Sequence, residues 1–375
     1  MTLPALIGVA VSMALPATAL AQRLSLVPLD ARVPRLPAPF VAEGRQHLLY
    51  ELRVTNLGRA DRAIQRLDVL QGNAIVASWS GDSLTAIAIR MGEAPGGDAR
   101  RLNAGRQVLV HLMVSLAPDR AARELTHRFL LTHPDSLSGP PRDTLVGPVI
   151  AAGPAPPVLS PPFKGGVWLA ANGPGNASGH RRTAVPIGGQ ARIAQRLAID
   201  WVKVGPDGRL WQGDSTRNEN WHGYREPLLA VAEGTVVDIK DGIPENTPLT
   251  PQRAVEITLE TIGGNYVIID IGGGRYAFYA HLVPGSLTVM VGDRVRTGQV
   301  IGLLGNSGNS DAPHLHFHLS DAPSPLGSEG IPYMIDRYEK LGQTGPMFMR
   351  GFSGPGTPEP RRGELPLQNH VVRFP

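Results

Sequence analysis

The sequence predicts a mainly β protein with two domains. A chain of 375 residues, 42% of them hydrophobic, exceeds the size at which a single core usually stops growing. Most apolar segments are short, alternate with polar residues and end in Gly, Asn or Asp, which is typical of antiparallel strands. A helical period of 3.6 residues is suggested only by "MIDRYEKLG" at 334–342.

Residues 1–21, "MTLPALIGVAVSMALPATALA", predict a signal peptide. They carry no charged side chain and end in Ala19-Leu20-Ala21, an A-x-A cleavage site. The mature chain is expected to begin at Gln22 and to be exported to the periplasm or cell envelope. The positive residues that usually start a signal peptide are missing, so an uncleaved membrane anchor is the alternative.

Residues 22–146 predict an Ig-like β-sandwich. Alternating segments such as "HLLYELRVTNL" and "QVLVHLMVSL" recur with turn residues between them, at roughly the spacing of a sandwich. The following segment, 147–165, is rich in Pro and Gly and predicts an extended linker.

A second antiparallel β domain is predicted for residues 166–340. Its segments include "PLLAVAEGTVVDIKDG" and "NYVIIDIGGGRYAFYAHL", in which "GGGR" at 272–275 predicts a hairpin turn. Residues 341–375 are again rich in Pro and Gly, and we expect a tail that wraps around the domain or hangs free.

Composition excludes several classes of site. The net charge of +4 is spread along the chain without a basic run, so no nucleic-acid partner is expected. The chain has no cysteine, so any metal must be bound by His, Asp or Glu and no thiol nucleophile exists. Neither a phosphate-binding G-x-x-x-x-G-K-[ST] nor a G-x-S-x-G motif is present.

The motif with the strongest chemical signal is "PHLHFHLS", which has histidines at 314, 316 and 318. Alternate side chains of a strand face the same side, so the three line one face. A rise of about 3.3 Å per residue separates the backbones of His314 and His318 by roughly 13 Å. At most two neighbours can therefore share one metal ion, and His316 belongs to either pair.

A catalytic zinc site needs three protein ligands and an open position, so at least one ligand must come from another strand. The residues alone leave several candidates open: Asp200, His281, His180 and His222.

The residues from about 165 to 335 resemble the M23 family of zinc metallopeptidases, the lysostaphin-like and LytM-type enzymes that cut peptide cross-links of peptidoglycan. The resemblance rests on the order "AVAEGTVV", "YAFYAHL", "VGDRVRTGQVIG", "LLGNSGNS" and "PHLHF". It implies an antiparallel β domain, a bound Zn²⁺ and peptidoglycan peptide stems as the partner.

Carried over by position, the resemblance makes Asp200 and His316 zinc ligands and His281 and His314 the catalytic pair. The two histidines would assist the metal-activated water and stabilise charge on the scissile carbonyl. His318 stands where the family often has an acidic residue. It is expected either to hydrogen-bond a ligand, to line the groove or to be solvated.

The sequence departs from the family pattern at Arg196. The family's first ligand pair is His-x-x-x-Asp, yet Arg196 stands four residues before Asp200, and a guanidinium has no lone pair for zinc. Some relatives carry the histidine in an earlier segment, and "GHRR" followed by "AQRLAIDW" resembles that arrangement. A hairpin at "VPIGGQAR" would bring His180 beside Asp200, so His180 is the predicted third ligand, with His222 as the alternative.

The sequence thus predicts a zinc metalloendopeptidase of the cell wall. The alternative is an inactive M23-like module that binds peptidoglycan or regulates another hydrolase. A different zinc enzyme with an H-x-H motif, such as a carbonic-anhydrase-like hydratase, fits the order of motifs less well.

Overall fold

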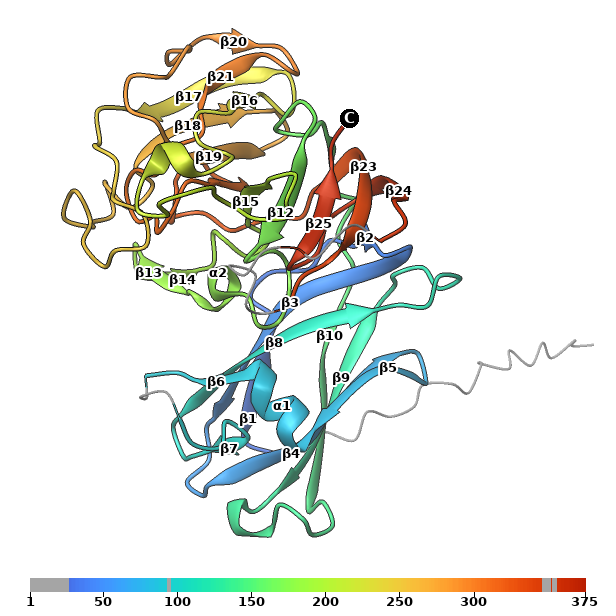
Figure 1. Ribbon diagram of the computed structural model, residues 1–375. Helices are drawn as coiled ribbons and strands as arrows, with labels where there is room; N and C mark the ends of the chain where they lie inside the picture. Colours follow the sequence, from blue (N-terminus) through green and yellow to red (C-terminus); the bar gives the residue numbers. More distant parts are fainter. Residues whose placement is uncertain (1–26, 93–95, 346–351, 353–355) are drawn as a thin grey trace, which may run out of the picture.

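The computed structural model describes residues 27–92, 96–345, 352 and 356–375, so the predicted signal peptide at 1–21 lies outside the described residues. The fold is mainly β, as predicted (Figure 1). Within the described ranges the helical elements are short: α1 (Gly81–Ile87), α2 (Gly179–Arg182) and the 3-10 turns η1 (Pro134–Ser136) and η2 (Asn218–Asn220). None of these helices has the length and apolar character needed to cross a membrane.

The N-terminal half contains two antiparallel sheets. The first has the order β1-β3-β8-β6 with β2 on β3, and the second has the order β10-β9-β4-β5 with β7 on β4. The first sheet consists of β1 (Leu29–Arg32), β2 (Phe40–Ala42), β3 (Arg45–Asn56), β6 (Ala88–Arg90) and β8 (Gln107–Ser115). The second consists of β4 (Arg62–Gln71), β5 (Ala74–Ser80), β7 (Arg101–Leu102), β9 (Leu125–Thr132) and β10 (Asp143–Ile150).

One buried cluster joins the two N-terminal sheets. Leu52 of β3 and Val110 of β8 belong to the same core as Leu67 of β4 and Phe129 of β9. Alternating apolar residues of each strand therefore meet between the sheets, as the period of two in the sequence requires. The assignment of this half to the Ig-like class stays a prediction, as do the domain boundaries.

The C-terminal half is built around one large sheet with the order β11-β23-β25-β12-β15-β22-β19-β18-β17-β20 and β24 on β23. Its strands are β11 (Val158–Leu159), β12 (Val167–Ala171), β15 (Ile199–Val204), β17 (Gly234–Lys240), β18 (Asn265–Asp270), β19 (Tyr276–Leu282), β20 (Arg294–Val295), β22 (Leu315–Ser320), β23 (Met334–Gln343), β24 (Glu359–Glu364) and β25 (His370–Arg373). Two small antiparallel pairs accompany it: β13 (Val185–Ile187) with β14 (Gln190–Arg192), and β16 (Pro227–Leu229) with β21 (Val300–Leu303).

Both predicted tight turns are present. Gly272, Gly273 and Gly274 have positive φ between β18 and β19, and Gly188 and Gly189 have positive φ between β13 and β14. Glycine adopts this left-handed backbone without the clash that a Cβ would introduce.

Two expectations for the end of the chain are wrong. The segment 334–342, suggested as a helix, forms β23, whose buried residues Ile335, Tyr338 and Leu341 pack in the sheet. The predicted tail 341–375 contributes β24 and β25, and β25 pairs with β12 and β23 in the interior of the sheet. Long-range strand pairing overrides the local signal in both places.

The two halves of the chain are packed against each other. Phe40, Ala42 and Leu49 of the N-terminal half belong to the buried cluster that fills the C-terminal half. The backbone N–H of Leu365 donates to the carbonyl of Val41 over 2.8 Å. Figure 1 shows β2 and β3 where the halves meet, next to β24 and β25, so the N-terminal half is in direct contact with the domain that carries the candidate site.

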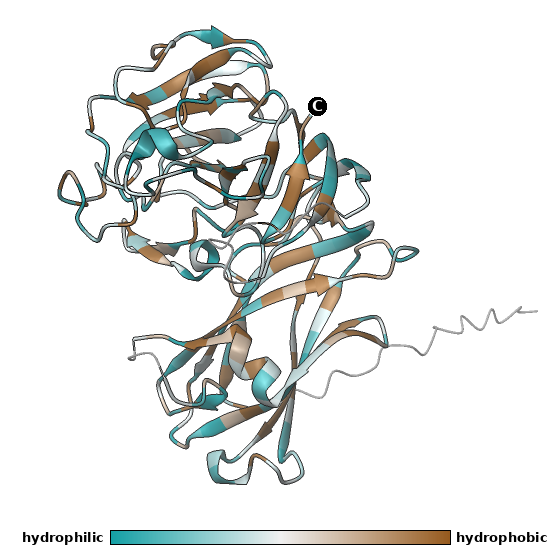
Figure 2. Cartoon of the chain, in the orientation of Figure 1, coloured by the Kyte–Doolittle hydropathy of each residue, from teal (hydrophilic) through white to brown (hydrophobic). Residues whose placement is uncertain are grey.

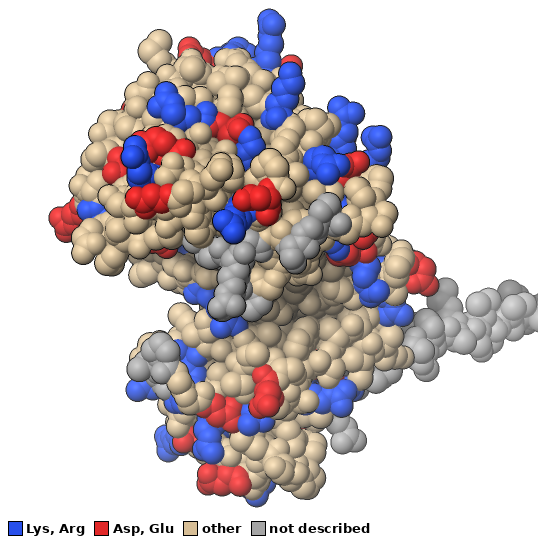
Figure 3. Space-filling model, viewed as in Figure 1, with Lys and Arg blue, Asp and Glu red and all other residues tan. Residues whose placement is uncertain are grey.

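Polar and apolar residues divide as the strand pattern predicts. Figure 2 shows hydrophobic residues concentrated on the strands of both halves, while many connecting loops are hydrophilic. On the face seen in Figure 3, Lys and Arg are interspersed with Asp and Glu. The mixture of both signs on this face agrees with the small net charge of +4.

Candidate metal centre

The site is organised around β22, which lies between β15 and β19. The strand register pairs His316 with Asp200 on one side and with Ala280 on the other. Paired residues on neighbouring antiparallel strands have Cβ atoms roughly 5 Å apart, so their side chains on one face meet. The sheet alone therefore brings His316 to Asp200.

His281 enters the site from an irregular point of β19. Two residues of β19, Ala280 and His281, lie opposite the single residue Tyr266 of β18, and His281 has a φ of +71°. A left-handed backbone costs a residue with a Cβ roughly 1–2 kcal/mol, and such bulges re-aim a side chain beside functional sites. The Nδ1–H of His281 donates to the carbonyl of Ser307 over 2.8 Å, which holds the ring in place.

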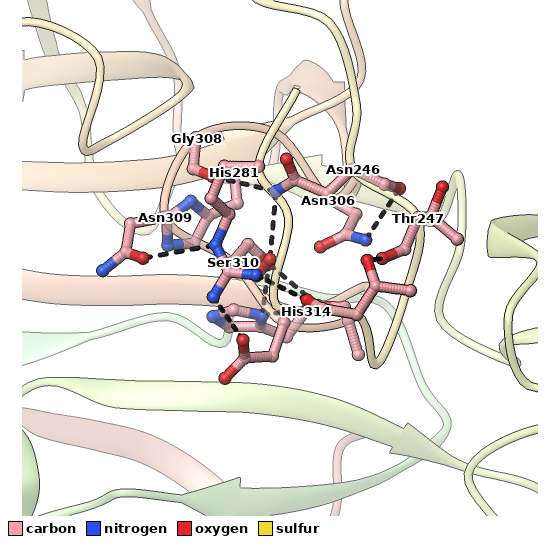
Figure 4. Close-up of polar contacts among 12 residues, drawn as sticks. Asn246, Thr247, His281, Asn306, Gly308, Asn309, Ser310 and His314 are labelled. Carbon is pink, nitrogen blue, oxygen red and sulfur yellow. Dashed lines mark hydrogen bonds and ion pairs between the residues drawn. The ribbon is translucent and has the colours of Figure 1, made fainter. Parts of the chain in front are cut away.

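His314 is placed by the loop that precedes β22 (Figure 4). Its Nδ1–H donates to the carbonyl of Ala312 over 2.8 Å, and Ser310 Oγ lies 3.2 Å from the same nitrogen. Asn246 holds this loop from the other side, since its Nδ2 donates to the carbonyls of Gly308 and Ser310 over 2.8 and 3.0 Å. The rings of His314 and His281 are 4.8 Å apart.

His180 reaches the site from α2, which precedes the β13–β14 hairpin in the chain. Its Nε2 lies 3.3 Å from Asp200 Oδ2, and its Nδ1–H donates to the carbonyl of Asn172 over 3.1 Å. Asn172 follows β12 with a φ of +48°, a conformation that asparagine tolerates better than most residues. The amide of Asn172 also donates to Asp200 Oδ2 over 2.9 Å, so Asn172 orients both residues.

Asp200 is the common neighbour of three histidines. Its Oδ1 lies 2.9 Å from His316 Nδ1 and 3.4 Å from His314 Nε2, while its Oδ2 faces His180. Burial acts to raise the pKa of Asp200, but His180 and His314 outweigh burial and hold that pKa well below its usual value. The carboxylate is thus ionised in a buried site, as a metal ligand must be.

The donor set fits a zinc ion. One ligand atom each of His180, Asp200 and His316 lies within 4.8 Å of the others, and bonds near 2 Å to a tetrahedral zinc place such atoms roughly 3–4 Å apart. The Nδ1–H of His180 donates to a carbonyl, which turns Nε2, the nitrogen that could bind a metal ion, toward Asp200.

Burial holds two of the other site histidines, His281 and His316, in the neutral form, whereas at His314 the charge of Asp200 outweighs burial and raises the pKa. Burial, reinforced by His314 and His316, moves the pKa of His281 well below its usual value. For His316, burial lowers the pKa to about 4, against the opposing effect of Asp200. Neutral imidazole is the form that binds a metal ion or accepts a proton.

A cavity of about 810 Å³ opens onto these residues. His180, Asp200, His281, His314 and His316 all line it. Its wall also carries other apolar and polar residues, among them Val202, Trp221, Phe278, Thr250, Gln195 and Asp311. The volume is large enough for an extended ligand of several bonds beside the histidines.

Three other residues from the motif analysis lie outside the ligand group. Arg196 does not line the cavity, because its guanidinium donates to Glu51, Glu329 and the carbonyl of Gly330. His222 faces Asp207, at 4.0 Å. His318 is buried behind His316, with its Nδ1 3.0 Å from His316 Nε2 and no hydrogen-bond partner for its Nε2 in the described part of the chain.

Two residues that position the site did not stand out in the sequence. Asn172 and Asn246 each bond to several groups around the histidines. An asparagine beside glycine, as in "ANGPGN", signals a left-handed turn, and this signal marks Asn172. Nothing in the sequence distinguishes Asn246 from a surface asparagine, because its partners lie some 60 residues away.

Residues 222–327 match the model of peptidase family M23, which confirms the prediction of an M23-like domain. The matched segment contains His281, His314 and His316 and begins downstream of His180 and Asp200. The part of the site that departs from the family's usual ligand pair thus lies outside the match.

Curated relatives are similar over short segments. Endolysin 2638A of Staphylococcus phage 2638A is 36% identical over 137 residues, which are 32% of this chain and 28% of that protein. Lysostaphin of Staphylococcus staphylolyticus is 46% identical over 86 residues, 22% of this chain and 18% of that protein. Peptidoglycan DD-endopeptidase ShyA of Vibrio cholerae is 45% identical over 65 residues, which are 17% of this chain and 15% of that protein. The chain spans less than a third of the length of these relatives.

Among solved structures, the catalytic domain of lysostaphin from Staphylococcus simulans is similar at 24% identity. The similarity covers 34% of this chain and 86% of that domain, with a TM-score of 0.21.

Proposed function

We propose that this chain, which carries an M23 peptidase-family domain at residues 222–327, is a zinc-dependent endopeptidase that hydrolyses peptide cross-links of peptidoglycan. The observation that carries the proposal is the group of His180, Asp200 and His316, which offers two imidazoles and one carboxylate at the wall of a large cavity. Three protein ligands with one side open to the cavity are the usual composition of a catalytic zinc site.

In this proposal His180, Asp200 and His316 bind the metal. Zinc, when bound, supplies a Lewis acid that polarises the scissile carbonyl and acidifies water at neutral pH. The buried carboxylate of Asp200 lowers the net charge of the site, and the carbonyl of Asn172 holds His180 with its Nε2 toward Asp200.

His281 and His314 are proposed to move the proton and to stabilise developing charge. Each ring donates its Nδ1–H to a backbone carbonyl, so each keeps Nε2 as the nitrogen that can accept a proton. One ring can take the proton from the attacking water, and the other can donate to the carbonyl oxygen once it is protonated. The two ring centroids lie 4.8 Å apart and both rings line the cavity, which supports a joint action on one bound peptide.

The substrate class rests on the relatives. Two of them are named lysostaphin and peptidoglycan DD-endopeptidase, and the latter name states the substrate. Peptidoglycan lies outside the cytoplasmic membrane, so this function requires export to the cell envelope, in agreement with the signal peptide predicted at 1–21.

The test measures zinc and hydrolysis on the same preparation. We expect the purified mature chain to contain one zinc per molecule and to release free amino groups from purified peptidoglycan, with the release abolished by a chelator and restored by zinc. The control variant His316→Ala should contain no zinc and release none. A wild-type protein without zinc would overturn the enzyme assignment and favour the inactive peptidoglycan-binding module, whereas zinc without hydrolysis would overturn the substrate class.

A further inference from the structure

A buried cluster of charges joins the two halves of the chain next to the candidate site. The carboxylate of Glu51, in β3, accepts from Arg181 Nε over 2.9 Å and from Arg196 Nε over 2.8 Å. Arg196 also donates to Glu329 over 2.7 Å. Arg181 is fully buried, and Glu51 and Arg196 are 3% and 5% exposed. Two positive and two negative groups therefore balance in a space with little water.

The two arginines belong to the segments that carry the first two candidate ligands. Arg181 directly follows His180 in α2, and Arg196 stands four residues before Asp200. The position at which the family pattern has a metal-binding histidine thus carries an arginine that points to the N-terminal half. In this chain one carboxylate from β3 is bound to both segments.

The N-terminal half supplies most of the hydrogen-bond partners of Arg181 in α2. A helix of four residues is too short to be stable by itself, because nucleation costs more than its one turn returns. Arg181 donates to Glu51 and to the carbonyls of Tyr50 and Leu112, all three in the N-terminal half, and to Asn176 of its own segment. Figure 1 shows α2 at the junction of the two halves, beside β3.

The free energy needed to bury the guanidinium of Arg181 without a partner favours its contact with Glu51 over other positions. A buried charge that loses its partner strongly destabilises its surroundings, so the favourable position of Arg181 is against Glu51. The adjacent residue, His180, is then held where its Nε2 lies 3.3 Å from Asp200.

We propose that Glu51 is a positioning residue of the metal site, which fixes His180 opposite Asp200 through Arg181, so that the N-terminal half completes the site of the C-terminal half. This inference rests on the proposed function, because it assumes that His180 binds the metal ion. Glu51 itself touches neither the metal ligands nor the cavity.

The experiment compares Glu51→Gln with a matched control, Glu43→Gln, in the full mature chain. Glu43 is another carboxylate of the N-terminal half that pairs with the C-terminal half, through Lys340 at 2.8 Å, but it has no contact with α2. Zinc affinity is measured by competition with a chromophoric chelator, and coordination by the visible absorption of the Co²⁺-substituted proteins. Residues that orient a metal ligand typically contribute 10–100-fold to affinity. We expect a loss of this size and weaker tetrahedral Co²⁺ bands in Glu51→Gln, and wild-type values in Glu43→Gln.

A second variant covers the case in which Glu51→Gln does not fold. Glu51→Gln with Arg181→Met removes one negative and one positive group and leaves the Arg196–Glu329 pair intact. A folded double variant with weakened zinc binding and altered Co²⁺ bands supports the inference. Wild-type zinc affinity in either folded variant, or an equal loss in Glu43→Gln, overturns it while the proposed function stands. A wild-type chain that binds no zinc overturns both.

Discussion

His180 Nε2 lies 3.3 Å from Asp200 Oδ2, although twenty residues separate the two in the chain. The contact joins a four-residue helix to a central strand of the large sheet. It supplies a second imidazole beside the pair that the sheet register already creates between Asp200 and His316.

Substitution of His180 removes the metal. We expect His180→Ala to lose stoichiometric zinc, with an affinity loss beyond the roughly 10–100-fold that residues around a ligand contribute. The control is His222→Ala, because His222 faces Asp207 and does not line the cavity. Metal analysis after gel filtration measures the zinc content of both variants. Zinc retained in His180→Ala and lost in His222→Ala would reverse the assignment.

Restoring the family's histidine at position 196 does not restore the site. In a His180→Ala background, we expect Arg196→His to bind no zinc, because the side chain at 196 points to Glu51 and Glu329. The single variant Arg196→His should also lower the free energy of unfolding by about 3 kcal/mol, since it leaves buried carboxylates with too few partners. Urea unfolding and metal analysis measure these effects. Recovered zinc in the double variant contradicts the geometry.

His281 separates catalysis from metal binding. His281→Ala should keep zinc and lose roughly 10²–10⁴-fold in hydrolysis rate, the usual contribution of a positioned acid or base. His133→Ala serves as the control and should keep the wild-type rate, because His133 is an exposed residue of the N-terminal half. The measurements are kcat on a cross-linked peptide and zinc content. Zinc lost together with activity would make His281 a ligand instead.

Asn246 supports the loop that carries His314. Asn246→Ala leaves the carbonyls of Gly308 and Ser310 without their donor, at roughly 1–3 kcal/mol per buried group. We expect a lower thermal midpoint and slower hydrolysis with unchanged zinc, because His314 loses its fixed position. Asn73→Ala is the control, since Asn73 is exposed in the turn between β4 and β5 and does not line the cavity. Equal effects in both variants would refute a specific role for Asn246.

Glu51 should make the free energy of unfolding depend on pH in the acidic range. Burial acts to raise the pKa of Glu51, but Arg196 and Arg181 outweigh burial and lower that pKa from 4.5 to about 2. Because the folded pKa is depressed, the stabilisation is complete above about pH 4.5 and is lost as the pH falls from there through about 2. The shift corresponds to on the order of 3 kcal/mol.

The measurement is urea unfolding of wild type and Glu51→Gln between pH 6 and pH 3. The gap in unfolding free energy between the two proteins should narrow as the pH falls below about 4.5. Glu339→Gln removes a half-exposed ion pair with Arg373 and should change stability by less than about 1 kcal/mol throughout. A gap that stays constant with pH is the contrary result.

Local sequence patterns predicted most strands but not all of their partners. Alternation of apolar residues and glycine turns located β18, β19 and β22, because these signals act between neighbouring residues. The same reasoning suggested a helix at residues 334–342, which form β23, and it assigned the residues of β24 and β25 to a tail. Their strand conformation comes from pairing with residues far away in the chain, and no short-range signal encodes such pairing.

The sequence by itself determined the donor atoms of the candidate site. It has no cysteine, it has histidines on one face of a strand, and it has an arginine at 196 that cannot bind zinc. Only the tertiary structure decided which histidine stands beside Asp200 and what Arg196 does. Both answers depend on Glu51, 145 residues before Arg196, because a buried guanidinium takes its position from the carboxylate that the fold brings to it.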